Sequence, residues 1–95
     1  MPTDHPTDTA TVAAVILDLV RARGPGKTIC PSEAARRLAV AEPGPDAWRA
    51  LMPAVHAAAG RLRGPRLIAV TQRSRAVDAL DAEGPIRLGL PPEDD

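Results

Sequence analysis

Arginine side chains are concentrated in one stretch of this chain, and they are its most suggestive chemical feature. Between Asp46 and Asp78 the sequence has six arginines and no acidic residue, although the whole chain is formally neutral. These arginines are Arg49, Arg61, Arg63, Arg66, Arg73 and Arg75. A guanidinium group is always charged and carries five donors in a planar fork, which suits phosphate and carboxylate oxygens. The stretch therefore predicts a surface that attracts a polyanion.

Other reactive residue types occur singly and do not form a recognisable site. Gly26-Lys27-Thr28 resembles the end of a phosphate-binding loop, but Arg21 stands where the first glycine of that motif is required. The segment also follows a predicted helix instead of a strand, so we interpret it as a turn. Cys30 is better explained as a structural cysteine at a helix start than as a reactive thiol. One cysteine and His56 do not make a metal site, and no Ser-His-Asp or Cys-His pair stands at a recognisable spacing. We therefore expect no enzymatic activity, no metal and no cofactor.

Composition restricts the class of protein further. Ninety-five residues suffice for one domain, and no apolar run approaches the roughly 18–20 residues of a membrane span. The N-terminus lacks the features of a signal peptide, and one cysteine cannot form an internal disulfide. We therefore expect a cytoplasmic protein that does not bind membranes. Arginine outnumbers lysine eleven to one, and Gln72 is the one side-chain amide in the chain, so few residues could read adenine.

The first half of the chain predicts two helices. An apolar stripe indicates a helix from Thr9 to about residue 23, capped by Asp8 or Thr9 and stopped by Gly24. Its members are Val12, Val15, Ile16, Leu19 and Val20. Residues 28–29 can add a short extended piece. Proline at position 31 and Glu33 mark a second helix start, with Cys30 or Ser32 as its cap and Ala34, Ala35 and Leu38 on its buried face.

The arginine-rich half predicts a third helix followed by strands. The helix begins near Asp46, and an apolar stripe runs through Trp48, Leu51, Val55, Ala58 and Leu62. Pro53 interrupts this pattern, so either the helix kinks there, which we favour, or 46–52 is a separate turn and the helix starts at Pro53. Residues 66–72 and 85–90 predict two strands joined by a loop over 73–84. Residues 1–8 are predicted to be a disordered tail and 91–95 an acidic tail, leaving one domain over 9–90.

This order of elements predicts an α+β fold, a winged helix-turn-helix with three helices followed by a two-stranded β-hairpin wing. The segments GPGKTICPSEAARRL (24–38) and WRALMPAV (48–55), with the closing VTQ, VD and GPIRLGL, carry a family resemblance. The chain resembles, from roughly Thr9 to Leu90, a bacterial family known as domain of unknown function 3253. The resemblance implies a small winged-helix domain and carries no established activity.

The predicted interface combines the third helix with the wing. In a winged helix the helix after the turn contacts the major groove, and the wing contacts phosphate or the minor groove. The residues expected at this interface are Arg36, Arg37, Arg49, His56, Arg63, Arg73 and Arg75. We expect Trp48 to pack in the core instead of stacking on a base. The resulting hypothesis is DNA binding with low sequence specificity; the alternative is a protein-interaction module that meets an acidic partner or forms a homodimer.

Overall fold

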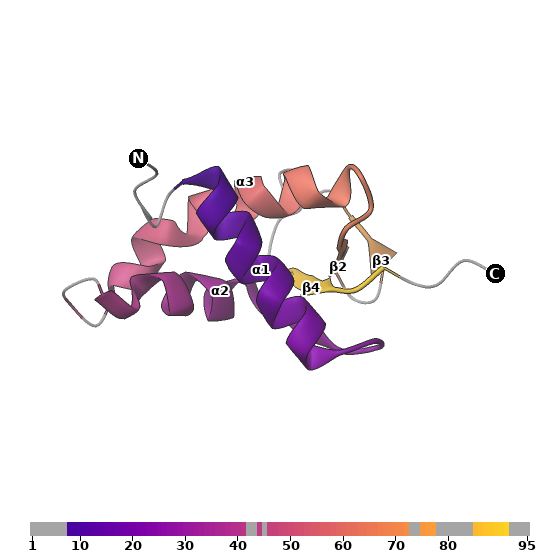
Figure 1. Cartoon of the computed structure of the whole chain (residues 1–95), viewed down its shortest axis with the longest axis horizontal. Helices are drawn as coiled ribbons and strands as arrows, with labels where there is room; N and C mark the ends of the chain where they lie inside the picture. Colours follow the sequence, from indigo (N-terminus) through magenta and orange to yellow (C-terminus); the bar gives the residue numbers. More distant parts are fainter. Residues whose placement is uncertain (1–7, 42–43, 45, 73–74, 78–84, 92–95) are drawn as a thin grey trace.

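The computed structural model describes residues 8–41, 44, 46–72, 75–77 and 85–91 of the chain. These residues form an α+β fold with three α-helices and a four-stranded antiparallel sheet. The helices are α1 (Thr9–Arg23), α2 (Pro31–Leu38) and α3 (Met52–Arg63). In Figure 1, α3 runs between the end of the molecule that holds α2 and the end that holds β2, β3 and β4.

Both helices of the first half lie where the sequence places them. Asp8 is the residue before α1, and Gly24, at a φ of 93°, ends the helix as predicted. Cys30 precedes α2, so it holds the cap position in preference to Ser32. Proline fits the first turn of α2 because the backbone N–H that it lacks would have no partner there. A short 3₁₀ segment, η1 (Ala39–Ala41), extends α2.

The preferred prediction of a kinked third helix beginning near Asp46 is wrong. A 3₁₀ segment, η2 (Ala47–Leu51), comes first, and the α-helix starts at Met52. This arrangement is closer to the alternative of a separate turn before Pro53. Pro53 lies in the first turn of α3, where its missing N–H costs no helical hydrogen bond and its fixed φ suits the helix. The chain therefore changes from a 3₁₀ segment to an α-helix just before Pro53, and α3 needs no kink to accommodate this proline.

The sheet is larger than the predicted pair of strands. Its strands are β1 (Thr28–Ile29), β2 (Ala69–Gln72), β3 (Arg75–Ala76) and β4 (Arg87–Gly89), in the order β1-β4-β2-β3. β2 begins three residues later than predicted because the chain is still turning at Arg66, whose φ is 61°. The prediction of an uninterrupted loop over 73–84 is wrong, because β3 lies within that range and pairs antiparallel with β2. Of the tails predicted at 1–8 and 91–95, only Asp8 and Pro91 lie within the described residues.

The core lies where the helices cover the sheet. α1 contributes every fourth residue, Val12, Ile16 and Val20, each with no exposed surface. The predicted stripe residues Val15 and Leu19 flank that line and are half-buried. From the other elements the fully buried or nearly buried residues are Ile29, Ala34, Ala35, Leu51, Val55, Ala58, Ala59, Leu62, Ile68, Val70, Ile86 and Leu88. This single cluster fixes α3 against α1 and the sheet, and so determines which arginines remain outside.

Candidate functional site

Two of the predicted interface arginines converge on the lone aromatic ring. The guanidinium carbon of Arg36, from α2, and that of Arg49, from η2, each lie 4.6 Å from the centroid of the Trp48 ring. Trp48 is half-buried and packs against the core, which agrees with the role predicted for it. Its ring also holds two cations, an arrangement worth about 0.5–1 kcal/mol for each exposed pair. The Nε of Arg49 also donates to Asp46 Oδ1 at 3.3 Å.

Arg37 lies apart from this cluster. Its Nη2 donates to Asp18 Oδ2 of α1 at 3.1 Å, and both side chains are more than half exposed. Successive residues of an α-helix are separated by about 100° around its axis, so Arg36 and Arg37 face different neighbours. The structure therefore does not bring Arg37 together with the arginines of η2 and α3.

Arg49, His56 and Arg63 lie on one side of the η2–α3 unit. A 3₁₀ segment advances about 120° per residue and an α-helix about 100°. Over the three steps from Arg49 to Met52 this difference adds up to about 60°, which is small enough to leave Arg49 on the same side as His56 and Arg63. His56 is half-buried, whereas Arg49 and Arg63 are exposed. We call Arg36, Arg49, His56 and Arg63 the cationic flank. From the rise per residue, Arg49 and Arg63 stand roughly 20 Å apart along the axis.

Arg63 borders a shallow groove between the end of α3 and the sheet. The groove has a volume of about 410 Å³ and is lined by Arg63, Gly64, Arg66, Ile68, Ala69, Val70, Ala76 and Pro91. Arg66, which the sequence-based interface omitted, therefore lies beside Arg63. Its left-handed backbone, uncommon for a residue other than glycine, follows the Gly64-Pro65 turn and brings it there. No periodic pattern in the sequence indicates this position.

The predicted wing arginines are only partly placed. Arg75 is exposed on β3, the edge strand beside β2. Its neighbour Ala76 lines the groove, and adjacent residues of a strand point to opposite faces, so Arg75 is directed away from Arg63. Arg73 lies outside the described residues. The sheet edge at β3 and the cationic flank therefore adjoin without sharing one surface at Arg75.

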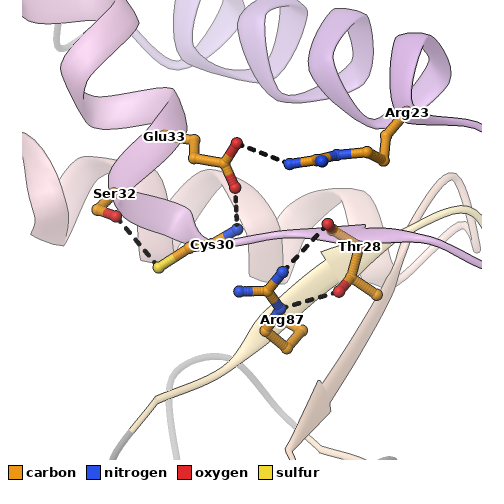
Figure 2. Close-up of polar contacts among 6 residues, drawn as sticks. All are labelled: Arg23, Thr28, Cys30, Ser32, Glu33 and Arg87. Carbon is orange, nitrogen blue, oxygen red and sulfur yellow. Dashed lines mark hydrogen bonds and ion pairs between the residues drawn. The ribbon is translucent and has the colours of Figure 1, made fainter.

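A polar network joins Cys30, Ser32 and Glu33 at the start of α2 to Arg23 of α1. Glu33 Oε2 accepts a hydrogen bond from the Cys30 backbone N–H at 2.7 Å, and its Oε1 pairs with Arg23 at 3.0 Å (Figure 2). The Ser32 hydroxyl donates to Cys30 Sγ at 3.1 Å. The carboxylate satisfies a backbone donor at the helix start, which is half of a capping box. Glu33 thus stabilises the helix start that it was predicted to mark.

The glycine-lysine-threonine segment is a turn leading into an edge strand. Gly26 has a φ of 77°, and Thr28 begins β1 instead of a helix, so the strand–loop–helix context of a phosphate-binding loop is missing. The side chain of Arg87 on β4 donates to Thr28 Oγ1 at 2.8 Å and to the Thr28 carbonyl oxygen at 3.2 Å (Figure 2). These contacts fasten β1 to the sheet and occupy the threonine hydroxyl.

The described residues hold few other features that suggest chemistry. Among them, no cluster of three or more histidine, cysteine, aspartate or glutamate side chains could hold a metal ion. Every buried side-chain nitrogen or oxygen in this part of the chain has a hydrogen-bond partner. None of the described helices combines the length and the apolar character needed to cross a membrane.

Comparison with known proteins places the chain in a family without assigning it an activity. No curated protein sequence matches it. A family model described as "Protein of unknown function (DUF3253)" matches residues 9–91, which include every described helix and strand. The match covers most of the chain, and its range agrees with the resemblance from roughly Thr9 to Leu90. The chain therefore belongs to the DUF3253 family of proteins of unknown function.

Proposed function

We propose that this domain is a winged helix that binds nucleic acid, mainly through phosphate contacts. The order of the elements supports the fold assignment, because β1 lies between α1 and α2 and pairs with β4, which pairs with β2. In this assignment α2 and α3 form the helix-turn-helix, with η1 and η2 in the connection. The β2–β4 pair that follows α3 corresponds to the wing. The proposal assigns no catalytic step to the chain.

The cationic flank is the observation that carries the proposal. Arg49 and Arg63 stand at opposite ends of one side of the η2–α3 unit, and Arg36 joins the first of them at Trp48. Each strand of B-DNA places one phosphate per about 3.4 Å of helix axis, so roughly 20 Å spans about six phosphates. Asp46 pairs with Arg49 at one end of this flank, and no other acidic residue occurs in the sequence between Asp46 and Asp78.

The outward face of α3 favours backbone contacts over base recognition. Pro53 and Ala57 are exposed on it, and Gly60 adjoins them. These residues offer no side-chain donor or acceptor to a base edge, but they permit the close approach of a phosphate backbone. Phosphate contacts fix position without reading sequence. We therefore expect affinity with little discrimination between sequences.

A salt-dependent titration tests the proposal. We would measure the fluorescence polarisation of labelled duplex and single-stranded oligonucleotides at several NaCl concentrations. Three phosphate contacts, from Arg36, Arg49 and Arg63, predict a slope of log affinity against log salt of about −2.7 for duplex DNA. Arg63→Ala removes one contact and should reduce that slope by about 0.9. Arg21→Ala, an equal charge change at an exposed position of α1, is the matched control and should leave it unchanged.

Two results would refute the proposal. One is affinity that does not rise as salt is lowered. The other is an Arg63→Ala variant whose salt slope equals that of the parent protein while both remain folded by circular dichroism. An equal loss in Arg63→Ala and Arg21→Ala would show that net charge, and not the cationic flank, controls binding.

A protein-interaction module is the second candidate, and exposed apolar side chains favour it. Val40 in η1 is 84% exposed, and Leu67, beside the groove, is 45% exposed. Such residues are ordinary when isolated, but either could anchor an acidic partner or a second copy of the chain beside the arginines. Sedimentation equilibrium over a range of concentrations would detect the homodimer. Self-association that Val40→Ser or Leu67→Ser abolishes, without oligonucleotide binding, would favour this candidate.

A further inference from the structure

The structure points to a phosphate-binding site formed by Arg36 and Arg49 on the ring of Trp48. This inference deepens the proposed function by naming the anchoring site and its ligand chemistry. It depends on the proposed function if the bound phosphate is part of a nucleic acid, and it is independent of that function if the ligand is a small phosphorylated molecule. Both guanidinium carbons lie 4.6 Å from the same ring centroid, so they are within twice that distance of each other.

Stacking on the ring prepares both arginines for an anion. A free arginine side chain loses about 2 kcal/mol of rotamer entropy when it is fixed, and a ring that already restrains it reduces this cost on binding. Arg36 comes from α2 and Arg49 from η2, and Trp48 holds the two ends together. Guanidinium groups form charge-assisted, two-pronged hydrogen bonds with phosphate oxygens.

The donors needed for such bonds remain available. Asp46 accepts from Nε of Arg49 at 3.3 Å, so this contact leaves the two terminal nitrogens of that guanidinium open to a ligand. Within the described part of the chain, Arg36 contacts the Trp48 ring and forms no hydrogen bond or ion pair. Both arginines are exposed, so an oxyanion could reach them from solvent. The Asp46 carboxylate is the competing anion at this site.

Trp48 gives the site a built-in reporter because it is the only tryptophan and the chain has no tyrosine or phenylalanine. We would titrate inorganic phosphate, adenosine monophosphate and a single-stranded oligonucleotide while recording tryptophan emission. NaCl at matched ionic strength is the blank. We expect a saturable change in emission with phosphate compounds beyond the NaCl response. Isothermal titration calorimetry supplies a readout that does not depend on Trp48.

Variants separate a binding site from simple shielding of the ring. Arg49→Ala should abolish the saturable response, and Arg49→Lys should recover it only in part because lysine lacks the planar fork. Asp46→Asn removes the competing carboxylate and should tighten phosphate binding roughly fivefold at low salt. If Arg36 and Arg49 only covered the Trp48 ring without binding an anion, Asp46→Asn would leave the response to phosphate unchanged. Arg21→Ala again provides the matched control.

The outcomes separate this inference from the proposed function. An emission response to inorganic phosphate equal to that of NaCl would overturn the site, as would unchanged affinity in both Arg49→Ala and Asp46→Asn. Oligonucleotide binding by polarisation with no change at Trp48 would overturn the site and leave the proposed function standing. A response to phosphate and the mononucleotide without oligonucleotide binding would support the site, assign it to a small phosphorylated ligand, and contradict the proposed function.

Discussion

Gly89→Ala tests whether β1 is held against β4 as tightly as the structure indicates. Gly89 is buried on β4 and pairs with Thr28 of β1 on one side and Ala69 of β2 on the other. A Cβ atom added there would lie 2.9 Å from the Lys27 carbonyl oxygen and 3.1 Å from Thr28 Cγ2. The closer contact is about 0.5 Å short of an ordinary van der Waals separation, and its atom belongs to the backbone, which cannot rotate away.

The expected magnitude follows from two opposing effects. Overpacking of a buried site costs about 1–3 kcal/mol, whereas alanine in place of glycine gains about 0.4–1 kcal/mol by restricting the unfolded chain. Relief by displacing β1 is restrained because Arg87 holds Thr28 through two hydrogen bonds. We therefore expect a net loss of about 1–2 kcal/mol in the free energy of unfolding. In a domain of this size that loss lowers Tm by roughly 5–15 °C.

Thermal and urea unfolding followed by far-ultraviolet circular dichroism would measure this effect. Gly64→Ala is the matched control, because its added Cβ would meet only the Arg61 carbonyl oxygen, at an ordinary 3.6 Å. Gly64 also has right-handed helical angles, so alanine should be neutral or stabilising by up to about 1 kcal/mol. A Gly89→Ala variant as stable as the parent would refute the close approach of β1. Equal losses of unfolding free energy in Gly89→Ala and Gly64→Ala would show that the loss does not come from the close contact at Gly89.

Three further substitutions test other contacts of the fold. Arg87→Ala removes two exposed hydrogen bonds to Thr28 and should lower the free energy of unfolding by about 1 kcal/mol in urea titrations, with Arg87→Lys recovering little. Glu33→Ala leaves the Cys30 N–H without its acceptor and should cost about 1 kcal/mol, whereas Glu33→Gln should retain most of the stability because the exposed ion pair contributes little. Ile16→Ala, at a position with no exposed surface, should cost about 2–5 kcal/mol and bring the midpoint of thermal unfolding down sharply.

Local sequence signals located α1, α2 and the extended piece at 28–29, but they missed the start of α3 and the strand β3. The spacing of Val12, Ile16 and Val20 and the proline and glutamate at the start of α2 report interactions within one or two turns. These interactions form wherever the helix forms, so a sequence pattern can reveal them. β1 and β3 are two residues long each, which is too short to show an alternating pattern. Their pairing depends on segments distant in the chain, such as Thr28 with Gly89.

The candidate site shows the same division between local and distant interactions. Composition alone revealed the acid-free arginine stretch. Arg49, His56 and Arg63 are seven residues apart, a spacing that keeps them on one side of the η2–α3 unit. Nothing in the sequence indicates that Arg36 would reach the ring of Trp48, because that contact joins α2 to η2. The left-handed turn at Arg66 and the pairing of Arg37 with Asp18 were equally inaccessible.

The sequence by itself thus determined α1 and α2, the apolar faces that the helices bury and the excess of cationic side chains after Asp46. These features follow from backbone propensity, capping and hydrophobic periodicity, which act over a few residues. Only the tertiary structure decided how the arginines are divided between Trp48, Asp18, the groove and the edge of the sheet. That division depends on how the common core orients α1, α2 and α3, since packing fixes which side chains from distant segments meet.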